Sequence, residues 1–180
     1  MPHFPRITAV ICAVIFTLTA LTACQGESQT GDTDELLQAV TEALGDSKGR
    51  GIIYFDRTRN PENEDLHRLS EEQLGYLYTG RIEPLPCQAR IAAYALWMPS
   101  DTGGCEIHVI ECQNPSDTEE IALFLQKRID KLKSSEILSI APENRQNCFK
   151  SAEVYRKGRF AFLLATPNNA SAKRAINSLL

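Results

Sequence analysis

The sequence predicts an α+β fold: a two-layer unit with the element order ββαββα, in which a four-stranded antiparallel sheet has its helices on one face. Two observations predict this fold. Apolar, strand-like segments occur in two pairs, and a turn-rich stretch separates the members of each pair. An amphipathic helix pattern follows each pair. Packing both helices on one face of the sheet is the economical way to bury their apolar stripes.

One or two short helices are expected ahead of this unit. Residues 34–44 have apolar side chains at helical spacing. Asp32 or Thr33 can cap this helix, and Gly45 can end it.

A second short helix is expected over residues 71–77, because Ser70 and Gln73 have the spacing of a capping box. The apolar run over residues 52–55 lies between the two helices. It is strand-like, but so short a run does not distinguish a strand from a buried helical turn.

The first hairpin is the clearest sheet signal. Residues 91–98 form a continuous apolar run, turn-rich residues 99–104 follow, and residues 105–112 alternate apolar side chains with Glu106 and His108. A continuous run is typical of a central strand, and alternation is typical of a strand with one wetter face.

The longest helix completes the first ββα half of the unit, and a second hairpin with a terminal helix forms the other half. Ser116 and Glu119 have the capping pattern at the start of the longest helix. Residues 152–155 and 160–165 form the second hairpin, and residues 168–169 provide the cap of a terminal helix. The expected buried stripe of the longest helix is Ile121, Leu125, Arg128 or Ile129, and Leu132.

The first 24 residues fit a bacterial lipoprotein leader. Residues 7–21 are apolar or weakly polar, and Leu21-Thr22-Ala23-Cys24 matches a lipoprotein processing site at all four positions. We therefore expect a signal peptide over residues 1–23, cleavage between Ala23 and Cys24, and a lipid on the Cys24 thiol. The apolar run of about 15 residues is shorter than the roughly 20 that a membrane-spanning helix needs. An uncleaved signal anchor is the alternative.

The mature chain would begin with a tether. Residues 25–33 have no apolar side chain and are rich in Gly, Ser and Thr, so residues 24–33 should form a flexible linker to one domain over residues 34–180. The membrane contact would be through acyl chains, in which each buried methylene contributes about 0.8 kcal/mol. These features predict a lipid-anchored protein that faces the outside of the cytoplasmic membrane.

Composition excludes several classes of partner and chemistry. The chain has 19 basic and 23 acidic side chains; residues 1–23 contain one Arg and no acid, so the mature chain has 18 against 23, a formal net charge of −5. This balance gives no electrostatic reason to bind nucleic acid. The sequence has no nucleophile elbow, phosphate-binding glycine loop, zinc-protease motif or Cys-x-x-Cys pair, and it calls for no cofactor and no metal.

Four cysteines remain in the mature domain, and an even number in an exported domain is compatible with disulfides. If residues 105–112 form one unbroken strand, Cys105 and Cys112 lie roughly 23 Å apart and cannot bridge. The favoured pairing is then Cys87 with Cys112 and Cys105 with Cys148. Four free thiols, buried as small apolar side chains, are the equally weighted alternative.

A set of short motifs occurs in a fixed order along the chain from residue 34 to the end. With the processing site at Cys24, they are Leu74 to Tyr78, Glu106-Ile107-x-Val109, the helix with Arg128, Pro142-Glu143, Ala152-x-Val154, Lys157-Gly158 and Phe160 to Leu164. This ordered set resembles the small bacterial lipoprotein family catalogued as domain of unknown function 4358. The resemblance implies an exported, lipid-anchored α+β module and brings no established activity. The four mature cysteines depart from the family's pattern.

Few side chains suggest chemistry. His108 is flanked by Ile107 and Val109, so it should point away from the core face, and we interpret it as a surface or packing residue. Glu106 and Glu111 lie five residues apart, on opposite faces of a regular strand, which excludes a paired carboxylate site.

One aromatic residue is a candidate for a binding surface. Trp97 and Tyr94 lie on opposite faces of one predicted strand; if helices cover only the Tyr94 face, Trp97 and His108 mark an exposed surface. A strand that is buried on both faces would show the same sequence pattern and is the alternative. The basic side chains of the longest helix are interpreted as its solvated side. They are Lys127, Arg128, Lys131 and Lys133.

The sequence therefore favours a binding or interaction module at the cell surface, with an envelope protein or a small ligand as its partner. It assigns no catalytic residue. The alternative is a cell-envelope enzyme whose site gathers around Glu106, His108 and Tyr94.

Overall fold

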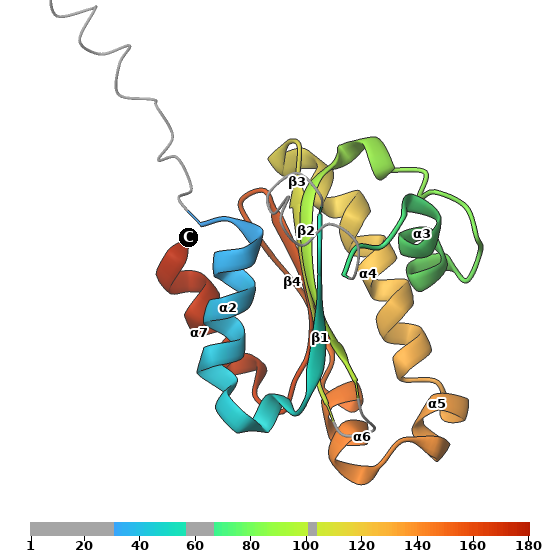
Figure 1. The fold of residues 1–180 in the computed structure, drawn as a ribbon, viewed down its shortest axis with the longest axis vertical. Helices are drawn as coiled ribbons and strands as arrows, with labels where there is room; N and C mark the ends of the chain where they lie inside the picture. Colours follow the sequence, from blue (N-terminus) through green and yellow to red (C-terminus); the bar gives the residue numbers. More distant parts are fainter. Residues whose placement is uncertain (1–30, 57–66, 101–103) are drawn as a thin grey trace, which may run out of the picture.

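A five-stranded antiparallel sheet, in the order β1-β2-β3-β5-β4, forms the middle layer of the protein (Figure 1). The computed structural model describes residues 31–56, 67–100 and 104–180. The strands are β1 (Gly51–Phe55), β2 (Ile91–Pro99), β3 (Glu106–Cys112), β4 (Glu153–Lys157) and β5 (Phe160–Ala165). The predicted α+β fold is confirmed, and so are both predicted hairpins. The apolar run over residues 52–55, which the sequence leaves open between a strand and a helical turn, is part of the fifth strand, β1. This strand pairs with β2 at the edge of the sheet.

Helices cover both faces of this sheet, so the predicted two-layer arrangement is wrong. Helices α2 (Thr33–Leu44) and α7 (Asn169–Leu179) pack on one face, and α3 (Glu71–Thr79) and α4 (Thr118–Leu132) lie on the other (Figure 1). The physical reason is visible in β3 and β5, in which every residue is buried. Strands buried on both sides need cover on both sides.

Local signals located most helix ends correctly. The side chains of Asp32, Ser70 and Asn168 accept hydrogen bonds from the first turns of α2, α3 and α7, as the sequence predicts. At α4 the prediction of a Ser116 cap is wrong, because a 3₁₀ turn capped by Asn114 comes first. The 3₁₀ turns are η1 (Gly45–Lys48), η3 (Gln88–Arg90) and η4 (Pro115–Asp117).

Two short helices after α4 were not predicted from the sequence. They are α5 (Ser135–Ile140) and α6 (Glu143–Lys150). Helix α5 buries none of its residues, and α6 buries only Cys148 and Phe149. Such helices lack the repeating apolar stripe that identifies a helix in a sequence.

The two faces of the sheet have separate apolar cores. Ile107 and Val109 of β3 pack with Leu36 and Ile176 on the α2/α7 side, whereas Ile110 packs on the α3/α4 side. Because successive side chains of a strand point to opposite faces, one strand contributes to both cores. Glu106 and His108 alternate with Ile107 and Val109 along β3, so they face α3 and α4. They too are inside the protein.

The segment that follows α3 folds back onto this helix at Gly75. A Cβ atom at this position would lie 1.7 Å from the Glu83 carbonyl oxygen, so only glycine permits the approach. Glycine inside a helix costs about 1 kcal/mol relative to alanine. The chain tolerates that penalty, and the close approach places residues 80–86 beside α4, where they help to build the candidate site.

Candidate functional site

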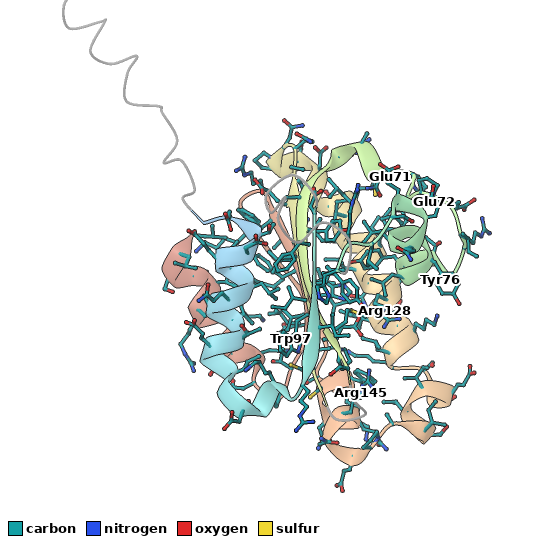
Figure 2. All side chains as sticks on the ribbon, viewed as in Figure 1. Glu71, Glu72, Tyr76, Trp97, Arg128 and Arg145 are labelled. Carbon is teal, nitrogen blue, oxygen red and sulfur yellow. The ribbon has the colours of Figure 1, made fainter. Side chains whose placement is uncertain are left out.

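A buried ion pair joins the centre of the sheet to α4. Glu106, on β3, is completely buried. Arg128, on α4, donates two hydrogen bonds to it: Nε to Oε1 at 2.8 Å and Nη2 to Oε2 at 2.9 Å. The Arg128 side chain is only 15 % exposed, and Figure 2 shows it between α4 and the sheet. Paired hydrogen bonds of this kind fix geometry as well as charge.

His108 extends this network toward α3. Its Nε2 lies 3.1 Å from Glu106 Oε1, and its Nδ1 lies 2.8 Å from the Tyr78 hydroxyl. A carboxylate only accepts hydrogen bonds, so Nε2 carries the proton, and Nδ1 accepts from the tyrosine. Met98 Sδ lies 3.3 Å from the same nitrogen, Nε2. Glu106, His108, Arg128 and Tyr78 are hereafter the buried network.

Burial and charge fix the protonation states of the buried network. Burial acts to raise the pKa of Glu106, but the Arg128 charge and the hydrogen bonds from His108 and Arg128 outweigh it and hold this pKa well below 4.5. Burial lowers the pKa of His108 below 6.5, against the opposing pull of Glu106. Burial, followed by the charge of Glu106, raises the pKa of Tyr78 well above 10. Near neutral pH the network therefore consists of one ion pair, a neutral imidazole and a neutral phenol.

Acidification is expected to destabilise the fold in two stages. Above pH 6.5 His108 is neutral in both the folded and the unfolded chain. Below this pH the unfolded chain takes up the proton first, so stability falls; below pH 4.5 the same argument applies to Glu106. Urea unfolding at pH 7.5 and 5.5 measures the first loss. His108→Gln, whose amide keeps a donor and an acceptor, should remove most of that difference. An undiminished difference in this variant would assign the loss to other groups.

Two cavities flank α3 on the side where it meets α4. The first has a volume of about 490 Å³ and is lined by α3, the end of β2 and α4, with Tyr76, Leu77, Ile82, Met98 and Lys131 among its lining residues. The second has a volume of about 670 Å³ and is lined by the end of α3, residues 80–86 and α4. Lys131 lines both cavities. The buried network lies beneath them, because Arg128 reaches the first cavity and Tyr78 reaches the second.

Cations and aromatic rings alternate along these cavities. The Lys131 ammonium is 5.9 Å from the centre of the Tyr76 ring, and the Lys127 ammonium is 4.7 Å from that of Phe124. Within the described ranges neither lysine has a carboxylate oxygen within 4 Å. Arg81, by contrast, lies 3.6 Å from Glu83. The two lysines therefore keep positive charge that no carboxylate neutralises.

The surface predicted from Trp97 and His108 is wrong. His108 is completely buried, and Trp97, only 9 % exposed, packs against the α2/α7 side with the Lys48 ammonium 5.6 Å from its ring. The prediction required one bare face of the sheet, and both faces are covered. Tyr94 is also apart from the proposed enzyme site, since its hydroxyl donates to the Leu69 carbonyl oxygen at 2.9 Å.

The charged residues of α4 and β3 lie partly where the sequence predicts. Arg128 is not on the solvated side of α4, whereas Lys127, Lys131 and Lys133 are exposed as expected. Glu106 and Glu111 do lie apart: Glu111 pairs with Arg159 at 2.6 Å, and Glu106 pairs with Arg128. The processing site at Ala23 and Cys24 lies outside the described residues.

Sequence reasoning missed Tyr78, Met98 and the pairing of Arg128. One signal was available for the arginine, since it falls at a position of the apolar stripe of α4, three residues after Leu125. A charge on a buried stripe requires a partner, and the second strand of the predicted hairpin offers two carboxylates, Glu106 and Glu111. Nothing local to residues 71–79 shows that Tyr78 reaches His108.

The described ranges contain no cluster of three or more His, Cys, Asp or Glu side chains arranged to hold a metal ion. In the same ranges, no helix is both long and apolar enough to cross a membrane. No family model, no curated protein and no solved structure matches this chain. The resemblance to the lipoprotein family therefore stays a prediction from the motifs.

Proposed function

We propose that this chain is a lipid-anchored, extracytoplasmic binding module that holds a small amphipathic anion between α3 and α4. The observation that carries the proposal is Lys131, a cation that lines both cavities and has no carboxylate oxygen within 4 Å in the described part of the chain. The anchor and the location rest on the leader that ends at Cys24.

The size and the lining of the cavities support a small ligand. Pockets for small molecules typically measure about 300–1,000 Å³ and combine apolar walls with a few polar groups. Tyr76 and Ile82 line the first cavity and are 53 % and 82 % exposed, so the apolar part of its lining is open to water. A bound apolar group would remove both from water.

Charge supports an anionic group on the ligand. The mature chain is acidic, yet Lys127 and Lys131 project from one side of α4 over the second cavity. A carboxylate, sulfonate or phosphate would complete the pairing that these ammonium groups lack within the described structure. Its apolar part would lie against Phe124 or Tyr76, beside the two lysines.

The alternative is a cell-envelope enzyme that uses the buried network, with Tyr78 in place of Tyr94. One observation favours it: the order hydroxyl, imidazole and carboxylate is that of an activated nucleophile. However, the raised pKa keeps the Tyr78 hydroxyl protonated, and His108 and Glu106 are completely buried. The network accounts better for how α3 and α4 are held on the sheet than for a reaction.

Lys131→Glu is expected to weaken ligand binding at least tenfold, because it replaces the shared cation with an anion. The probe is 8-anilinonaphthalene-1-sulfonate, an amphipathic anion, titrated into the purified domain. Amide NMR shifts should map binding to Leu77, Ile82 and Lys131, which distinguishes the site from binding to unfolded protein. Lys133→Glu makes the same charge change two residues away, outside both cavities, and should alter affinity less than twofold. Equal losses in the two variants would contradict the proposed site.

A further inference from the structure

The four cysteines of the described domain divide into two pairs, one on each face of the sheet. Cys105 and Cys112 lie at the two ends of β3, seven residues apart, so their side chains point to opposite faces. Cys105 and Cys148 belong to the α2/α7 core, whereas Cys112 and Cys87 belong to the α3/α4 core. All four are buried free thiols.

The backbone brings Cys87 toward Cys112. Cys87 precedes the 3₁₀ turn η3, which leads directly into β2, and Ile91 of β2 is the register partner of Cys112. The Gln113 amide donates to the Arg90 carbonyl oxygen at 2.8 Å and holds the turn against the end of β3. Burial raises the pKa of Cys112 to about 12, and the neighbouring charges of Asp117 and Cys87 act in the same direction.

Cys148, on α6, lies at the Cys105 end of β3: Glu106 pairs with Ala165 of β5, and the Ser151 hydroxyl, at the end of α6, donates to the Thr166 carbonyl oxygen at 3.1 Å. The Cys105 thiol donates to the Lys48 carbonyl oxygen at 3.2 Å, and the Cys148 thiol donates to the Asn144 carbonyl oxygen at 3.4 Å. Burial raises the pKa of Cys105 to about 12, and after burial the largest contribution is the proximity of Cys148. Thiol hydrogen bonds are weak, so little opposes the rotation of either sulfur toward its neighbour.

We propose that the exported domain carries two disulfides, Cys87–Cys112 and Cys105–Cys148, one in each core. The proposal rests on the proposed extracytoplasmic location, where disulfides form and persist. Either alternative pairing would have to cross the sheet, because Cys105 faces one core and Cys112 the other. In each bond two thiols lose their protons and two electrons to a disulfide oxidant by exchange, and the oxidant leaves as two thiols.

Peptide mapping of the refolded mature chain, with Cys24 replaced by serine so that only the four domain thiols remain, tests the pairing without reference to location. The reduced, unfolded chain is refolded in a buffer of reduced and oxidised glutathione, and remaining thiols are blocked with N-ethylmaleimide. Trypsin alone would leave Cys105 and Cys112 in one peptide, so cleavage after Glu106 and Glu111 is added; tryptic cleavage after Arg90 separates Cys87 from Cys105. We expect the two cross-linked peptides Cys87–Cys112 and Cys105–Cys148. Any other pairing, or four blocked thiols, would overturn the proposal.

Two single serine variants test each bond separately, and a map of the cellular protein tests whether both bonds form in the cell. In Cys112→Ser, only Cys87 should react with the maleimide while Cys105–Cys148 still forms; in Cys148→Ser, only Cys105 should react. The same map of protein taken from bacterial membranes with its thiols blocked at lysis should show both bonds. If the bonds form on refolding but the cellular protein has free thiols, the pairing stands, and the proposed location and the oxidised state in the cell are refuted.

Discussion

Replacing Glu106 with alanine should lower the free energy of unfolding by about 3–5 kcal/mol, the usual loss when one partner of a buried ion pair is removed. Glu106 is completely buried and accepts hydrogen bonds from Arg128 and His108. Its loss leaves the Arg128 charge uncompensated within a largely apolar layer, and the His108 N–H without its carboxylate. Chemical denaturation of the purified domain measures the change.

Two further variants distinguish a buried charge from a lost contact. The double variant Glu106→Gln/Arg128→Met removes both charges and keeps an acceptor for His108, so it should be much more stable than Glu106→Ala. Glu153→Ala breaks the pair with Lys173, in which both side chains are about a third exposed, and it should change stability by less than about 1 kcal/mol. If Glu106→Ala is no more damaging than Glu153→Ala, the buried network does not stabilise the fold.

The expected loss links stability to the candidate site. Arg128 lies on α4 one turn before Lys131, so its pairing with β3 fixes the height and rotation of the helix that lines both cavities. His108 and Tyr78 connect the same network to α3. The position of the binding face thus depends on groups that are themselves hidden from the ligand.

Local patterns in the sequence predicted the individual elements well, because each pattern acts within one turn or one hairpin. Capping side chains such as Asp32 and Ser70, and the alternation along β3, need no information from distant residues. The pairing of the two hairpins through β3 and β5 also follows from their apolar character. The side of the sheet that each helix covers is a global property, and no local pattern encodes it.

The polar residues of β3 show why the candidate site was harder to predict. Alternation of Glu106 and His108 with apolar neighbours is typical of a solvated face, and here the same alternation is buried because the polar groups satisfy one another. The partners that decide the outcome, Arg128 and Tyr78, come from two helices remote in the chain. The cavities depend in addition on the close approach at Gly75, which becomes apparent only in three dimensions.

Cys24→Ala should transfer the protein from the membrane fraction to precursor or soluble material almost completely. The leader is expected to be cleaved before Cys24, so acyl chains would be the whole anchor; two or three chains hold a protein almost permanently, and none holds it at all. Cys12→Ala changes the other leader cysteine and should leave the membrane fraction unchanged. Fractionation with an antibody against the folded domain measures both variants. Equal membrane retention of the two, with the leader still present on the wild-type protein, would indicate an uncleaved helix as the anchor.

Metabolic labelling with radiolabelled palmitate, combined with mass analysis of the mature amino terminus, tests the lipid anchor itself. Label should enter the wild-type protein, none should enter Cys24→Ala, and the mature chain should begin at an acylated Cys24. An unlabelled protein whose amino terminus is Met1 would contradict the lipid anchor, and with it the extracytoplasmic location on which the proposed function rests.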